Sequence, residues 1–125
     1  MKENVEARIE KRVTIDGASV KYRKLNGNAF SGRFTEPLHL KNISKHGACF
    51  EIHHYLRNGD TLLIDLIMPD KENIQARGVV KWTQINSWKG LTEAGVEFSQ
   101  FGWGDPWNFT QYKTKLNSIL DKTYN

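Results

Sequence analysis

The chain has 125 residues, 38% of them hydrophobic and 26% charged, which is enough for one folded domain with its own core. Its single cysteine, Cys49, excludes an internal disulfide, and no apolar run is long enough to span a membrane. The N-terminal sequence also lacks the apolar stretch of a secretory signal, so we expect a cytoplasmic protein without membrane insertion.

The net charge of +4 is concentrated in the first half of the chain. Residues 1–60 contain 11 Lys and Arg against 7 Asp and Glu, whereas residues 61–125 contain 7 against 7. A basic half favours an anionic partner, which could be a nucleotide, a nucleic acid or an acidic protein surface. Charge alone does not choose among these three.

Residues 1–17 are predicted to form a flexible N-terminal arm, because the first twelve are mostly charged and have little to bury. The arm carries Arg8 and Arg12, four positions apart. Arginines on a flexible segment can close over a ligand bound to a rigid surface, although ordering the segment costs free energy. Taken alone, the two arginines would be interpreted as part of a solvated arm.

Six segments with alternating apolar residues predict β-strands within residues 18–104. The alternating residues are Ala18, Val20 and Tyr22; Leu38 and Leu40; Ala48, Phe50 and Ile52; Leu62, Ile64, Leu66 and Met68; Ala76, Gly78, Val80 and Trp82; and Ala94, Val96 and Phe98. Gly78 is expected to mark a bulge or bend, and residues 86–92 are expected to form a loop. Six short strands separated by turn residues predict an all-β fold, a six-stranded antiparallel β-barrel.

Residues 105–125 are predicted to form a C-terminal helix that packs on the barrel. Asp105 followed by Pro106 is typical of a helix start. Apolar side chains then recur on one face, at Phe109, Tyr112, Leu116, Ile119 and Leu120. Trp103 and Trp107 are interpreted as a barrel plug or an anchor for the helix, in preference to a surface for a partner.

The polar loop 42–47, NISKHG, separates the second and third predicted strands. Asn42 and Ser44 are ordinary turn formers, and Gly47 supplies either a positive φ or room for another group to approach the backbone. On its own this segment would be interpreted as a hairpin turn.

The arginine pair, as R-x-x-x-R, and the loop, as [D/N]-x-S-x-x-G, together resemble the PilZ domain, a bacterial receptor for cyclic di-GMP. The later strand-like segments follow in the order of that family, so the resemblance covers about residues 7 to 100. It implies a β-barrel, in agreement with the alternation. It also implies that Arg8 and Arg12 clamp phosphate and base. Asn42 and Ser44 would then meet guanine edges, and Gly47 would let the loop backbone approach the ligand.

Three positions depart from the common family pattern. Asn42 stands where many members have Asp, and an amide accepts through one uncharged oxygen, so it would hold guanine N–H groups more weakly. His46 stands where a second glycine is common, so the loop would be stiffer or contribute an imidazole. Ala7 precedes the motif where members that bind a stacked ligand pair tend to carry arginine, so we expect one ligand per domain.

The resemblance implies a receptor that changes conformation when cyclic di-GMP binds and signals to a separate effector protein controlling motility, exopolysaccharide or biofilm. One alternative is a ligand-independent interaction module. A barrel that binds single-stranded nucleic acid is less favoured, because it would need exposed aromatic residues along the basic face. An enzyme is not expected, because the sequence shows no pair of acidic residues, no catalytic triad and no phosphate-activating loop. The histidines have no metal-ligand spacing, so neither a metal site nor a cofactor is expected.

Overall fold

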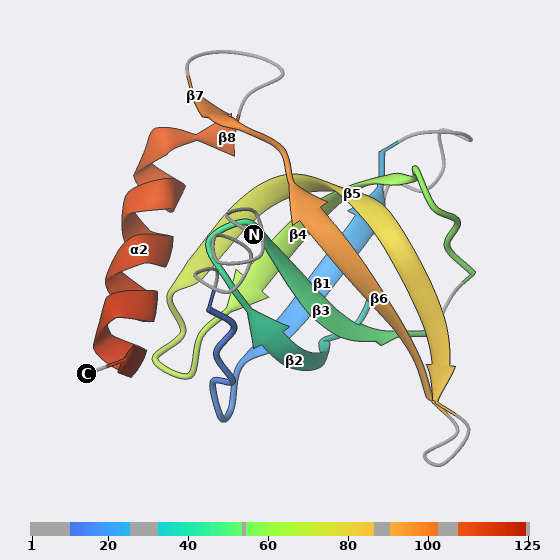
Figure 1. Cartoon of the computed structure of the whole chain (residues 1–125), viewed down its shortest axis with the longest axis horizontal. Coiled ribbons are helices and arrows are strands. Elements are labelled where there is room, and N and C mark those ends of the chain that lie inside the picture. Colours follow the sequence, from blue (N-terminus) through green and yellow to red (C-terminus); the bar gives the residue numbers. More distant parts are fainter. Residues whose placement is uncertain (1–10, 26–32, 54, 87–90, 103–107, 125) are drawn as a thin grey trace, which may run out of the picture.

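The β-strands close into a barrel, and one helix lies along its side (Figure 1). The computed structural model describes residues 11–25, 33–53, 55–86, 91–102 and 108–124. The barrel strands are β1 (Ser19–Lys24), β2 (Leu38–Ile43), β3 (Gly47–Ile52), β4 (Thr61–Ile67), β5 (Asn73–Asn86) and β6 (Leu91–Phe98). Two short strands follow, β7 (Phe101–Gly102) and β8 (Asn108–Phe109), and then the helix α2 (Thr110–Tyr124).

The barrel is closed in the order β1-β2-β3-β6-β5-β4, and every neighbouring pair is antiparallel. Closure gives each of the six described barrel strands a hydrogen-bonded neighbour on both sides. The prediction of a six-stranded antiparallel barrel with a C-terminal helix is confirmed.

The core fills the barrel with the alternating apolar side chains that the sequence singled out. In β4, Leu62, Ile64 and Leu66 are fully buried, and the residues between them are half-buried. Phe50 of β3 is also fully buried, and its ring lies 5.7 Å from that of Tyr22. Burying side chains of this size is the main free-energy source for a domain of this length.

The N-terminal segment is attached to the barrel earlier than the sequence predicts. Val13 is only 7% exposed, its N–H donates to the carbonyl of Ile43 (2.8 Å), and its carbonyl accepts from the Ile43 N–H (2.9 Å). Ile15 packs against the core as well. The predicted arm boundary at residue 17 is therefore wrong, because two apolar residues hold this segment on the barrel. Ala7 and Arg8 lie outside the described residues.

The hairpin between β5 and β6 is longer than predicted. Strand β5 runs 14 residues to Asn86, and Asn86 pairs with Leu91 at the start of β6, inside the expected loop 86–92. The hairpin extends on the side of the barrel away from α2 (Figure 1).

Helix α2 packs on the barrel as predicted, but it begins later. Leu116 and Leu120 are buried, and Tyr112 and Ile119 pack partly against the core. The predicted start at residue 105 is wrong, because residues 108 and 109 form β8, which pairs in parallel with β7. The expected helix cap and both tryptophans, residues 103 and 105–107, lie outside the described part of the chain.

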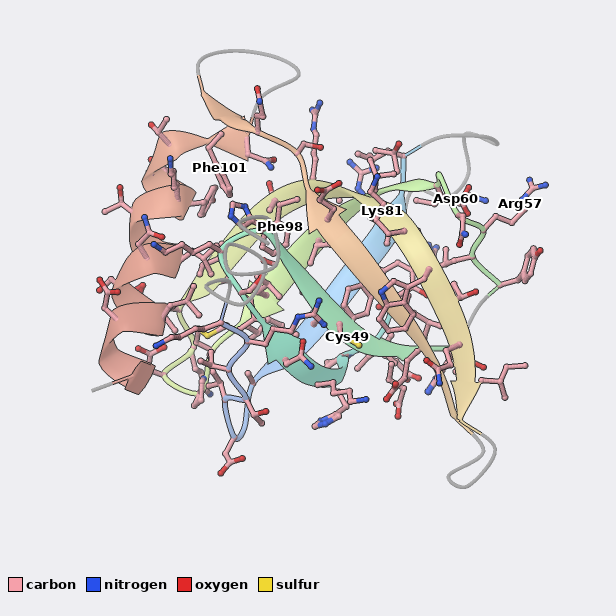
Figure 2. All side chains as sticks on the ribbon, viewed as in Figure 1. Cys49, Arg57, Asp60, Lys81, Phe98 and Phe101 are labelled. Carbon is pink, nitrogen blue, oxygen red and sulfur yellow. The ribbon has the colours of Figure 1, made fainter. Side chains whose placement is uncertain are left out.

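A buried asparagine fixes the approach to α2. The Asn108 side chain accepts from the Arg77 N–H (2.7 Å) and donates to the carbonyls of Arg77 (3.1 Å) and Ser99 (2.9 Å). It thereby joins Arg77 within β5 and Ser99, the residue after β6, to β8. Phe101 of β7 lies beside the helix (Figure 2). None of the helices in the described residues combines the length and apolar character needed to cross a bilayer.

Candidate functional site

A bulge in β2 turns Asn42 towards the outside of the barrel. Leu40 pairs with Phe50, an inward residue, but the next pair along the ladder is Asn42 with Cys49, so Lys41 is an extra residue. Paired residues share a face of the sheet, and an inserted residue reverses the alternation that follows it. Asn42 therefore lies in strand β2 and on the outer face, and not in a loop as predicted. The next residue, Ile43, points inward and is fully buried.

A second bulge, in β5, does the same for Trp82. Val80 pairs with Val96 and is buried, but Trp82 pairs with Gly95, so Lys81 is the extra residue here. The sequence placed Trp82 on the same face as Val80, and that expectation is wrong because the bulge reverses the alternation. A bulge or bend was expected at Gly78, but the bulge in β5 is at Lys81.

Two glycines on the outer face between these bulges allow neighbouring groups to approach the strands closely. At Gly95, an added Cβ would collide with the indole ring of Trp82, which therefore lies directly over this strand. At Gly47, an added Cβ would collide with the carbonyl oxygen of Val96. Among the described glycines with positive φ are Gly17 and Gly59 but not Gly47. Of the two predicted roles for Gly47, close approach is the one that the structure shows, and the group that approaches is strand β6.

Strand pairing brings Arg12 to this surface. The antiparallel bridge between Val13 and Ile43 places the preceding residue, Arg12, alongside Ser44. The side chain of Arg12 is exposed, whereas Ser44 is buried and its hydroxyl accepts from the His46 N–H (3.2 Å). The Ser44 N–H donates to the Gly47 carbonyl (2.9 Å), which closes the turn. This serine therefore shapes the loop in addition to facing the pocket.

These elements enclose a pocket of about 220 Å³ on the outer face of the barrel. Four of the five predicted site residues line it, and the fifth, Arg8, lies outside the described residues. The pocket is lined by Arg12, Asn42, Ser44, His46, Gly47, Ala48, Cys49, Lys81, Trp82, Gly95, Val96 and Glu97. Cys49 on β3 and Lys81 on β5 mark it in Figure 2.

Three functional candidates in this pocket were not predicted from the sequence: Lys81, Trp82 and Glu97. Glu97 lies directly opposite Gly47 in the β3–β6 ladder, and its Oε1 is 3.3 Å from the Lys81 Nζ. All three residues occur in ordinary alternating strand sequence. They come close to residues 42–47, the motif loop, only because β6 pairs with β3 and β5 pairs with β6.

The cysteine at the pocket floor is not set up as a nucleophile. Burial raises the pKa of the Cys49 thiol, and the negative charge of Glu93 raises it further, against smaller opposing effects of Lys41 and Arg12. The protonated thiol is therefore favoured at neutral pH, which agrees with a packing role. The described residues contain no cluster of His, Cys, Asp or Glu that could hold a metal ion.

The pocket combines groups that suit a purine nucleotide. An indole face can stack on a base, and a guanidinium can pair with phosphate oxygens or with guanine O6 and N7. The neighbouring Asn42 amide and the loop backbone add neutral hydrogen-bonding groups.

Comparisons with known proteins identify the family and the fold of the chain. A family model of the PilZ domain matches residues 6–102. No curated protein showed significant similarity to the chain. Among solved structures, the Bacillus subtilis inhibitor of motility MotI/DgrA superimposes with a TM-score of 0.65 at 13% identity, covering 90% of this chain and 48% of that one.

Two further structures are those of proteins solved with cyclic di-GMP. The MrkH complex from K. pneumonia gives a TM-score of 0.64 at 14% identity, covering 90% of this chain and 49% of MrkH. The PilZ domain of YcgR from Escherichia coli gives 0.65 at 12% identity, covering 92% and 89%. The chain thus spans about half the length of MotI/DgrA and MrkH. PilZ domains are non-catalytic receptor domains for cyclic di-GMP, and this chain belongs to the PilZ domain family.

Proposed function

We propose that this protein is a receptor that binds cyclic di-GMP in the pocket between Arg12, the motif loop and Trp82. Binding changes its conformation and so signals to a separate effector protein, in the control of motility, exopolysaccharide or biofilm. The observation that carries the proposal is that Arg12, Asn42, Ser44 and Gly47, distant in sequence, line one pocket. Membership of the PilZ family supports the identity of the ligand.

Each group has a distinct role in the proposed complex. Arg12, together with Arg8, clamps phosphate and base, because a planar guanidinium can do both. Asn42 and Ser44 meet guanine edges, and the indole of Trp82 stacks on a base. Gly47 acts chiefly by letting β3 and β6 come close together, because it has no side chain to collide with the Val96 carbonyl.

A path of hydrogen bonds supports a conformational response. The His46 carbonyl accepts from the Phe98 N–H (2.7 Å), which ties the motif loop to the end of β6. The next residue, Ser99, is bonded through its carbonyl to Asn108, two positions before α2 begins. A ligand that moves the loop would therefore displace the approach to α2, and a partner that contacts α2 would sense the difference.

The test is isothermal titration with cyclic di-GMP at two temperatures, with GMP and a short single-stranded DNA as controls. Saturable binding of cyclic di-GMP alone, with one ligand per chain, is expected. No heat change at either temperature would overturn the proposal and favour the ligand-independent interaction module. Binding of DNA would instead favour the nucleic-acid barrel.

Removing the motif arginines should weaken binding without unfolding the protein. Arg12→Ala and Arg8→Ala are each expected to reduce affinity at least about tenfold, since a hydrogen bond to a charged group contributes roughly 1.5 to 3 kcal/mol. Lys11→Ala is the matched control, because it removes a neighbouring positive charge that does not line the pocket. An arginine variant that binds as tightly as the wild type would refute the role assigned to that residue.

A further inference from the structure

A negatively charged side chain lies in the pocket close to the motif loop. Among the described lining residues, Glu97 is the sole carboxylate. It pairs directly with Gly47, so no side chain at that position of β3 stands between the carboxylate and the loop. Its side chain is 58% exposed, which leaves the carboxylate accessible to a ligand.

The chemistry of guanine gives this carboxylate a task that the loop performs poorly. The Watson–Crick edge of guanine presents two adjacent donors, N1–H and N2–H, which a carboxylate can accept together with its two oxygens. Asn42 offers a single uncharged carbonyl oxygen, and its NH₂ group is a donor. Charge-assisted hydrogen bonds are about twice as strong as neutral ones. The pocket therefore holds its charged acceptor on β6 and not in the motif loop.

The neighbouring cations make a carboxylate compatible with an anionic ligand. Lys81 lies 3.3 Å from Glu97, and Arg12 also lines the pocket. A lysine beside the carboxylate offsets its repulsion of the phosphates.

We propose that Glu97 is a base-specificity residue, which accepts the N1–H and N2–H of one guanine of the bound nucleotide and compensates for the amide at Asn42. This inference rests on the proposed function, because it assumes that a guanine nucleotide occupies the pocket. Glu97 selects the base, and the arginines hold the phosphates.

Titration of two variants with two ligands tests the inference. Glu97→Gln keeps the size of the side chain but removes its charge. Glu93→Gln is the matched control: Glu93 is also on the outer face of β6 and also pairs with a lysine, Lys41 at 3.2 Å, but it does not line the pocket. The ligands are cyclic di-GMP and its inosine analogue, whose bases lack the N2 amino group.

Glu97→Gln should bind cyclic di-GMP about tenfold more weakly than the wild type, the loss expected when a charged hydrogen bond becomes neutral. The analogue should lose less, so the wild-type preference for guanine over hypoxanthine should shrink in this variant. Glu93→Gln should leave both affinities and the preference unchanged. Urea unfolding of Glu97→Gln should show the stability of the wild type, since Glu97 lies on the surface.

Other results would overturn the inference. Wild-type affinity in Glu97→Gln, an unchanged base preference, or an equal loss in Glu93→Gln would each show that Glu97 does not read the base. Tighter binding by Glu97→Gln would show that the carboxylate only repels the phosphates. If the wild type bound neither ligand, the proposed function itself would fail and this inference with it, a result distinct from failure of Glu97 alone.

Discussion

The two faces of the β3–β6 pair are built by different rules. On the inner face Phe50 pairs with Ala94, and both are fully buried apolar residues. On the outer face Cys49 pairs with Gly95, and Gly47 pairs with Glu97. Apolar side chains fill the inside, whereas Gly47, Cys49 and Gly95 leave room outside for the indole of Trp82 and for the pocket. The pocket therefore lies where small residues leave space on the outer face, opposite the closely packed core on the inner face of the same strands.

The largest expected effect comes from breaking the inner face. Phe50→Ala should lower the free energy of unfolding by about 3 to 5 kcal/mol, through lost burial and the cavity left behind. Its neighbour Glu51, on the outer face, provides the control, and Glu51→Ala should cost less than about 1 kcal/mol because its contact with His53 is at the surface. Urea unfolding measures both. Similar losses in the two variants would contradict the division between the faces.

A smaller effect should separate the two outer glycines. Gly47→Ala sets a methyl group against the Val96 carbonyl, which is backbone, so the β3–β6 ladder must shift at a cost of about 1 to 3 kcal/mol. Gly95→Ala meets the Trp82 ring, a side chain that can move aside, so its cost should be lower.

The two glycine variants also differ in what they do to the pocket. Gly95→Ala should weaken ligand binding more than it weakens the fold, because it displaces the ring over the pocket. Urea unfolding and titration with cyclic di-GMP check both statements. If Gly95→Ala proved the more destabilising of the two, the distinction between a backbone neighbour at Gly47 and a movable side chain at Gly95 would be wrong.

The smallest effect concerns the thiol at the pocket floor. Because burial raises the pKa of Cys49, its alkylation by iodoacetamide should be slow at neutral pH and should reach half its maximal rate at a higher pH than in an unstructured peptide. The unfolded chain releases the thiol proton first as pH rises, so stability should fall slightly above the ordinary thiol pKa. Cyclic di-GMP should slow alkylation further by covering the floor. If cyclic di-GMP accelerated the alkylation of Cys49, the ligand would bind somewhere other than this pocket.

The positions of the strands could be predicted from the sequence, because the residues on the buried face of a strand recur at every second position. Leu62 to Leu66 and Ala94 to Phe98 show this directly, since each alternation reappears as buried positions in one strand. The two motifs likewise singled out Arg12, Asn42, Ser44 and Gly47, which line the pocket. The start of α2 was missed because Asn108 forms three hydrogen bonds to Arg77 and Ser99, partners about 31 and 9 positions away in sequence.

By itself, therefore, the sequence determined the strands, the closed all-β architecture, the apolar face of the helix, and Arg12, Asn42, Ser44 and Gly47 as a candidate site. These follow from local periodicity and from short motifs. Only the tertiary structure decided that Trp82 faces outward and that Glu97 lies opposite Gly47. Bulges at Lys41 and Lys81 reverse the alternation, and nothing in a lysine signals a bulge, because the extra residue exists only relative to the strand that pairs with it.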